Sequence, residues 1–183
     1  MDVFLLFPLT VQPVISYSNE QAIKRNALVT TIPLLSPVYT VKFQFKLTSL
    51  GTSLANVFQM TTSNTDGTAV GQRLPCIWFR SENNQIQAQV GTSSTNNEYK
   101  VEQKYFNKNT IIGKWVQVLV TQRLEGKASY IYNVKINGVD IMSIPNTKPT
   151  TFANVKVFIS NNFNPEAPGF VKDLSIIPTA KGM

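Results

Sequence analysis

Histidine is absent from the 183 residues of this chain. Its absence removes the side chain that most often acts as a general acid or base near neutral pH. It also removes the Ser-His-Asp and Cys-His nucleophilic arrangements and the commonest zinc ligand. The single cysteine, Cys76, excludes an intrachain disulfide and a multi-cysteine metal site. Because Cys76 lies within an apolar segment, we expect a buried structural side chain and not a reactive thiol.

Carboxylates are also few: 10 Asp and Glu stand against 17 Lys and Arg, which gives a net charge of +7. A glycoside hydrolase needs two carboxylates that flank one bond, and on a single strand they must stand two or four residues apart to share a face. Only Glu98 and Glu102 have this spacing, and they lie in a segment rich in Lys and Asn. The sequence therefore predicts a protein that binds its partners and is not an enzyme.

No stretch of the chain has the features of a membrane, secretory or nucleic-acid-binding segment. No apolar run approaches the roughly 18 residues that span a bilayer. The apolar piece at 3–7 is too short for a signal peptide and has no basic flank. The positive charges are scattered, with Lys24-Arg25 as the densest cluster, so we expect no specific nucleic-acid site. The sequence leaves open whether the protein is cytosolic or a mature secreted domain.

Alternation of apolar and polar residues dominates the rest of the chain. The stretch 114–144 contains three such runs, at 115–121, 130–136 and 139–144. A period of two places successive side chains on opposite faces of a strand, so each run offers one apolar face to a core. Asn137-Gly138, between the second and third runs, tolerates the positive φ angles of a two-residue hairpin turn. This stretch predicts a three-stranded antiparallel meander against which the other strands pack.

Further strands are expected at 3–7, 12–16, 27–32, 39–48, 56–62, 74–80, 85–90, 99–106, 155–159 and 170–177. Proline punctuates the first two and charged residues mark 99–106, so we expect these three at sheet edges. We expect the strand 27–32 to end at Pro33. No 3.6-residue apolar period persists for three turns, which predicts negligible helix. The chain is therefore expected to be one all-β domain, 1–183, an antiparallel two-sheet jelly-roll β-sandwich of roughly a dozen strands.

Several short segments, taken in order, resemble one family. They are Tyr39 to Lys46, Trp78-Phe79, Trp115 to Val118, Tyr132 to Gly138, Ala153 to Phe158 and Gly169 to Ile176. This series resembles the concanavalin A-like lectin/glucanase superfamily, which includes laminin G-like domains, over about residues 39–177. The resemblance implies a jelly-roll fold of the small, secreted, animal type. The Glu-x-Asp-x-Glu strand of the glucanase members is missing, so the resemblance does not imply hydrolysis.

Lectins hold sugars with aromatic rings and with polar side chains that converge on one pocket. Trp78 and Arg80 share one strand face, and Gln85, Gln87 and Gln89 form a polar row on the next strand. We expect these two strands to pair as a hairpin. A row of amides is costly to bury without partners, so we interpret it as an exposed hydrogen-bonding surface.

Three further groups are candidates for ligand binding. Trp115 is a second aromatic candidate, and Asn162 and Asn164 belong to an Asn-rich loop. We expect this loop to lie near the one that contains Asn64 and Asp66, which are candidate calcium ligands because calcium prefers oxygen. With only one carboxylate among its ligands, such a site would bind calcium weakly. A structural interpretation competes for each group, because tryptophans commonly lie in cores and Asn-rich loops are commonly plain turns.

These features favour a non-enzymatic, lectin-like domain whose partner is a glycan or a glycoprotein. No cofactor is expected beyond a weakly held calcium ion. Two alternatives stay open, because one fold serves many functions. The first alternative is a protein-interaction or adhesion module. The second is a structural unit that associates into a homo-oligomer.

Overall fold

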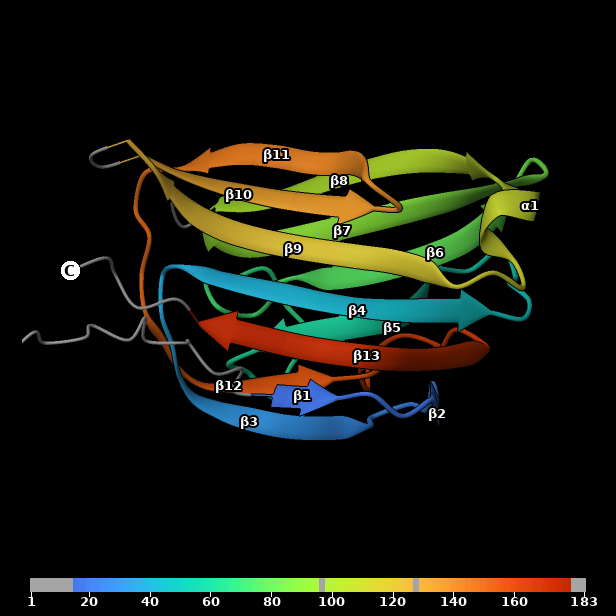
Figure 1. The fold of residues 1–183 in the computed structure, drawn as a ribbon, viewed down its shortest axis with the longest axis horizontal. Coiled ribbons are helices and arrows are strands. Elements are labelled where there is room, and N and C mark those ends of the chain that lie inside the picture. The colour runs from blue at the N-terminus through green and yellow to red at the C-terminus, as the bar shows by residue number, and fades with distance from the viewer. Residues whose placement is uncertain (1–14, 96–97, 127–128, 179–183) are drawn as a thin grey trace, which may run out of the picture.

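The computed structural model describes residues 15–95, 98–126 and 129–178, which form two antiparallel sheets packed face to face (Figure 1). The seven-stranded sheet contains, from one edge to the other, β1 (Ile15–Tyr17), β13 (Gly169–Pro178), β4 (Tyr39–Leu47), β9 (Val116–Glu125), β10 (Ser129–Ile136) and β11 (Val139–Asn146). Its seventh strand, β2 (Gln21–Ala22), pairs with β13 at the same edge as β1. This sheet is the layer in which β4, β9 and β13 run across Figure 1.

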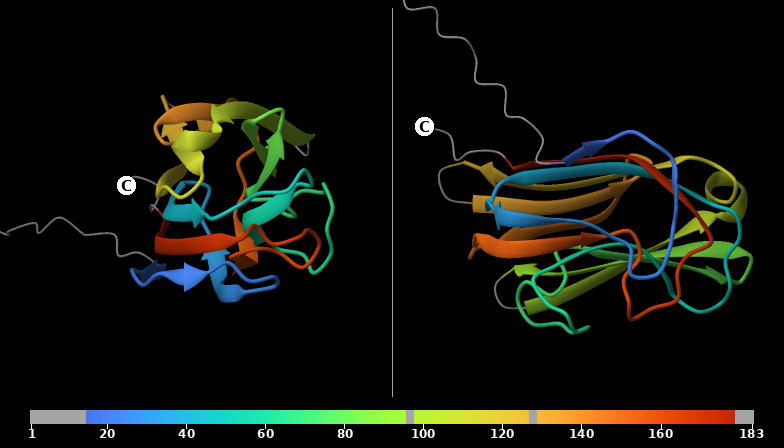
Figure 2. Two further views of the ribbon diagram at one scale, coloured as in Figure 1. Left: turned by 90° about the vertical axis from the view of Figure 1, so that its right-hand side faces the viewer. Right: turned by 90° about the horizontal axis from the view of Figure 1, so that it is seen from below.

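The six-stranded sheet forms the second layer. It contains, in order, β3 (Leu28–Leu35), β12 (Phe152–Phe158), β5 (Ala55–Thr61), β6 (Cys76–Glu82), β7 (Gln85–Thr95) and β8 (Glu98–Asn107). The chain crosses between the layers from β3 to β4 to β5 and again from β11 to β12 to β13, and Figure 2 shows the two layers edge on. The predicted all-β jelly-roll sandwich is confirmed. The one helix of the described residues is the single turn α1 (Lys108–Ile111).

The meander predicted at 114–144 is confirmed as β9, β10 and β11, which pair in sequence order. Asn137 and Gly138 form the turn between β10 and β11, with φ angles of 48° and 77°. Both values lie in the left-handed region that a tight hairpin turn requires. The local turn chemistry therefore sets the register of the pairs next to the turn, before a bulge between Val134 and Lys135 shifts it.

Two aromatic contacts join the sheets across the core. Phe43 and Phe45 of β4 point inward together with the other apolar residues of that strand, as its alternation predicts. The ring centroid of Phe43 lies 4.7 Å from that of Phe58 in β5, and the ring of Phe45 lies 4.7 Å from that of Phe79 in β6. All four rings are fully buried. Burial of such large apolar side chains is the main force that holds the two layers together.

The edges of the six-stranded sheet differ in part from prediction. The strand 27–32 was expected to end at Pro33, and this is wrong, because β3 continues through Pro33 to Leu35. β3 pairs only with β12, so the missing N–H of Pro33 interrupts no ladder on the open side. The charged segment 99–106 lies at the opposite edge as β8, as predicted. The predicted strand 3–7 lies outside the described residues, and of 12–16 only the start of β1 is described.

Cys76 is fully buried at the start of β6, as predicted. Its Sγ accepts a hydrogen bond from the side-chain amide of Asn56 at 3.2 Å. Burial raises the pKa of the thiol well above its ordinary value, so Cys76 stays protonated and unreactive at neutral pH. Among the described residues, no helix has the length and apolar character that a membrane span requires.

Candidate functional site

Most of the side chains singled out in the sequence lie on one surface, the outer face of the six-stranded sheet. This is the face turned away from the seven-stranded sheet. β6 and β7 pair as a hairpin, as predicted, with Arg80 opposite Gln87 and Trp78 opposite Gln89. Directly opposed residues of an antiparallel pair point to the same side of the sheet. The register therefore places the side chains of Trp78, Arg80, Gln87 and Gln89 together on this face.

The predicted row of glutamines does not form an exposed surface. Gln87 is only 1% exposed, because its amide donates to the side-chain oxygen of Gln103 at 2.6 Å and to the hydroxyl of Tyr105 at 3.1 Å. Its own oxygen accepts from Arg80, whose guanidinium also pairs with a neighbouring carboxylate at 2.8 Å. The expectation of an open amide row is thus wrong for Gln87. Of the three glutamines only Gln85 is exposed, and Gln89 is half-buried.

Trp78 supports a loop and offers no free ring face. It is 3% exposed, and its indole N–H donates to the side-chain oxygen of Asn164 at 2.9 Å. The guanidinium of Arg73 lies between the Trp78 ring, 4.9 Å away, and the Tyr99 ring, 4.8 Å away. Burial raises the pKa of the Tyr99 hydroxyl, which therefore stays neutral at physiological pH. Trp78 and Asn164 thus hold the loop that follows β12 against the sheet.

The two candidate calcium ligands both contact cations. The carboxylate of Asp66 pairs with the guanidinium of Arg73 at 2.9 Å. The side-chain oxygen of Asn64 accepts a hydrogen bond from the ammonium group of Lys156. A calcium ion would have to displace both positive groups while gaining only one formal negative charge. In the part of the chain that the structure describes, no three acidic or thiol side chains gather where a metal ion would bind.

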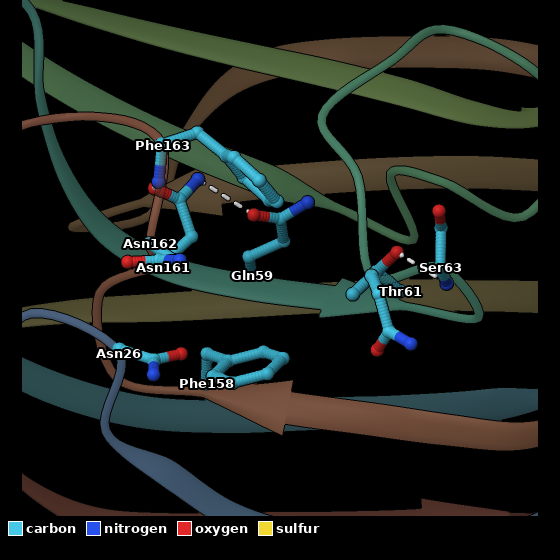
Figure 3. A pocket seen from close by; sticks show the side chains of 9 residues that line it. Asn26, Gln59, Thr61, Ser63, Phe158, Asn161, Asn162 and Phe163 are labelled. Carbon is cyan, nitrogen blue, oxygen red and sulfur yellow. Dashed lines mark hydrogen bonds between the residues drawn. The ribbon is translucent and has the colours of Figure 1, made fainter.

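A pocket of about 230 Å³ opens on the outer face of the six-stranded sheet, beside this loop (Figure 3). Its lining comes from β5, β12, the loops that follow these two strands and the turn before β3. The lining residues are Asn26, Gln59, Thr61, Ser63, Asn64, Phe158, Asn161, Asn162 and Phe163. We call this site the Asn161 pocket. It contains the predicted Asn162 and Asn64, and so confirms that the Asn-rich loop lies near the 63–72 loop.

Asn161 organises the pocket from a buried position. Its side-chain oxygen accepts from the backbone N–H groups of Phe163, at 3.0 Å, and Asn164, at 2.9 Å. Its amide nitrogen donates to the side-chain oxygen of Gln59 at 2.6 Å, the contact drawn in Figure 3. Gln59 is held in turn by a hydrogen bond from its amide to a backbone carbonyl at 3.0 Å. The base of the pocket is thus a pair of fixed amides whose positions do not depend on a ligand.

The rim of the pocket combines apolar rings with amides that have no partner of their own. Phe158 on β12 and Phe163 on the loop lie on either side of Gln59 in Figure 3, and Phe163 is 37% exposed. The side chains of Asn26 and Asn162 are exposed, and neither makes a hydrogen bond within the described residues. Two amides are therefore free to bind a ligand, each with donors and an acceptor.

The charged groups near the pocket are held by neutral groups of the protein and do not belong to the lining. The guanidinium of Arg25 donates to the backbone carbonyl of Asn162 at 2.8 Å, and the backbone N–H of Arg25 contacts the Glu166 carboxylate at 2.5 Å. The ammonium group of Lys156 is hydrogen-bonded to Asn64. No charged side chain is among the residues that line the pocket. The site therefore suits an uncharged, hydroxyl-rich group more than an ion.

Trp115 lies apart from all of these residues. It immediately precedes β9 in the seven-stranded sheet, on the other side of the sandwich. Its indole is half-buried, and the ammonium groups of Lys46 and Lys172 lie 4.7 Å and 4.3 Å from the ring centroid. Trp115 therefore cannot contribute to the Asn161 pocket.

Comparison with known protein families finds no family that matches this sequence, and none of the curated proteins has a matching sequence. Known structures do share the fold. A native heptameric SAP-like pentraxin from Limulus polyphemus is 17% identical with a TM-score of 0.54, over 91% of this chain and 76% of that one. The alginate lyase Aly36B is 10% identical with a TM-score of 0.55, over 92% and 85%.

A third similar structure is the CBM40 of the Ruminococcus gnavus IT-sialidase, solved bound to α2,3-sialyllactose. It is 10% identical with a TM-score of 0.50, over 91% of this chain and 95% of that one. At such identities the likeness shows the fold alone, and it agrees with the jelly-roll sandwich that the sequence resemblance implied. The finer assignment to a small, secreted, laminin G-like animal type stays a prediction.

Proposed function

We propose that this chain is a non-enzymatic carbohydrate-binding domain that holds a neutral sugar residue of a glycan in the Asn161 pocket. The observation that carries the proposal is the combination of fixed amides, free amides and phenyl rings around one small cavity. Sugars present apolar C–H faces and a ring of hydroxyl groups, which phenyl rings and amides match respectively. The similar folds include a module solved bound to a sialylated sugar, which supports carbohydrate in general as the class of partner.

The size of the pocket supports a single sugar ring as its occupant. Pockets for drug-sized ligands have volumes of about 300–1,000 Å³, and this one is smaller at about 230 Å³. A longer glycan would place one residue in the pocket and extend over the exposed surface near Asn162. Such shallow sites bind individual sugars weakly, and we expect useful affinity only when several copies engage one glycan-bearing surface.

Replacing Phe163 with alanine tests the proposal. The ring is partly exposed and makes no contact across the core, so its removal should weaken sugar binding by about tenfold with little loss of stability. The measurement is binding to an array of neutral glycans, followed by calorimetry with the best one. Phe170→Ala is the matched control, because Phe170 is a half-buried phenylalanine of the opposite sheet. Equal binding by both variants and by the unaltered protein would refute the pocket assignment.

Self-association is a second candidate function, favoured by apolar side chains on the open edges of the six-stranded sheet. Leu28 and Leu34 on β3 are 53% and 63% exposed, and Val101 and Tyr105 on β8 are 38% and 43% exposed. Open edges with apolar side chains readily pair with a further strand. Light scattering over a wide range of concentrations tests this candidate, and a constant monomer mass would contradict it.

A further inference from the structure

The outer face of the seven-stranded sheet carries a cluster of aromatic rings and ammonium groups that the pocket does not use. Lys46 of β4 stands directly opposite Phe170 of β13, and its ammonium group lies 5.1 Å from the phenyl centroid and 4.7 Å from the indole centroid of Trp115. Lys172, two residues along β13, places its ammonium group 4.3 Å from the same indole. We call these four residues the Trp115 cluster.

The cluster has more positive charge than its neighbours balance. The ammonium group of Lys46 lies 3.6 Å from the carboxylate of Glu20, a weak and partly exposed pair. Lys172 makes no ion pair with any described residue. Attraction to the negative face of the indole holds both lysines in place, although their like charges repel each other. An anion placed between the two ammonium groups would relieve this repulsion.

A depression of about 450 Å³ continues the surface next to the cluster. Lys42 borders it, and this exposed lysine is also without an ion pair among the described residues. Gln44, Gln117 and Ser175 add side chains that can hydrogen-bond to hydroxyl groups. The carboxylate of Asp173 in the depression is held by the amide of Gln44 at 2.8 Å. The outer face of β4 and its neighbours β9 and β13 thus carries positive charges next to groups that can bind hydroxyls.

We propose that this face binds an acidic polysaccharide, with a sulfate or carboxylate group held between Lys46 and Lys172. Charge complementarity selects an anionic partner, and the neighbouring amides and hydroxyl suit the sugar hydroxyls of such a chain. A single-stranded nucleic acid fits less well, because it binds by stacking bases on free aromatic faces. Here ammonium groups already lie near the indole and the phenyl ring. The proposal is independent of the Asn161 pocket, which lies on the opposite side of the sandwich.

The test measures binding of the full chain to a heparin-derived hexasaccharide by calorimetry at low salt. Lys46→Gln/Lys172→Gln should weaken binding by about tenfold and should flatten the fall of affinity with added salt. The control is Lys104→Gln/Lys148→Gln, which removes the same charge at exposed positions, on β8 of the other sheet and in the segment between β11 and β12, and should bind nearly as the unaltered protein does. If the double variant of the cluster does not fold, the single variant Lys172→Gln replaces it in the same measurement, because it keeps the ion pair of Lys46 with Glu20.

Three results would overturn the proposal. The first is an absence of binding to the hexasaccharide at low salt, and the second is an equal loss in the cluster and control variants, which would indicate only net charge. The third is equally tight binding of oligodeoxythymidine that is lost in the same cluster variant, which would assign the face to nucleic acid. Neutral maltohexaose should be unaffected by the cluster substitutions, and any loss with it would also count against an anion site.

Discussion

Replacing Phe43 with alanine will lower the free energy of unfolding by about 3–5 kcal/mol, the usual cost of removing a buried aromatic ring. The Phe43 side chain is fully buried on β4, and its ring stacks on that of Phe58 at 4.7 Å. Because this contact joins the two sheets, its loss leaves a cavity that neither backbone can close by a local shift. A domain of this size is stable by only about 5–15 kcal/mol. The variant should therefore be close to unfolding at physiological temperature.

Urea unfolding followed by fluorescence measures this effect. The matched control is again Phe170→Ala, a change of the same size on the outer face of the same sheet, where we expect a loss of about 1 kcal/mol or less. A Phe43→Ala variant no less stable than the control would contradict the description of the core. It would mean that the two sheets do not pack through these rings.

Replacing Asn161 with alanine will weaken sugar binding by about 100-fold and will also lower the free energy of unfolding. The variant loses two loop hydrogen bonds and the contact to Gln59, which is left with a buried, unpaired oxygen. Each such loss costs about 1–3 kcal/mol, so we expect a lower free energy of unfolding by about 2–4 kcal/mol. Because the Asn161 amide is removed and Gln59 keeps only its hydrogen bond to a backbone carbonyl, the pocket should lose this affinity.

Asn162→Ala separates these two effects. Its side chain is exposed and makes no hydrogen bond to another described residue, so the variant should keep its stability and bind sugar about tenfold more weakly. Calorimetry with the best neutral glycan and thermal unfolding measure both variants together. An Asn161→Ala variant that binds as tightly as the unaltered protein would show that the pocket is not the sugar site.

The fold could be predicted from the sequence largely because side-chain alternation and turn chemistry act locally. The period of two along β4 and the Asn137-Gly138 turn each specify their own structure, whatever lies far away in the chain. The end of β3 could not be predicted in this way. Whether Pro33 stops a strand depends on whether its N–H faces a neighbouring strand, and only the sheet order decides that.

The site could be predicted only in part, because it is assembled from distant segments. The Asn-rich loop and the loop with Asn64 are visible in the sequence, and they do meet at the pocket. Gln59 and Phe158 were missed, since they look like ordinary members of strands until the pairing of β5 with β12 places them side by side. Gln87 shows the reverse case. Its partners Gln103 and Tyr105 come from the next strand, so nothing in its own strand reveals that it is buried.

The most direct test of the account is a titration of the isotopically labelled protein, followed by the side-chain amide resonances of its Asn and Gln residues. The titrants are neutral monosaccharides: glucose, galactose, mannose, fucose and N-acetylglucosamine. For at least one of them we predict changes in the side-chain amide chemical shifts of Gln59, Asn161 and Asn162. The amide of Gln87 should not change, because it is buried on the same face and hydrogen-bonded to other side chains of the protein. No shift with any sugar, or shifts confined to residues outside the pocket, would contradict the proposal that this cavity binds carbohydrate.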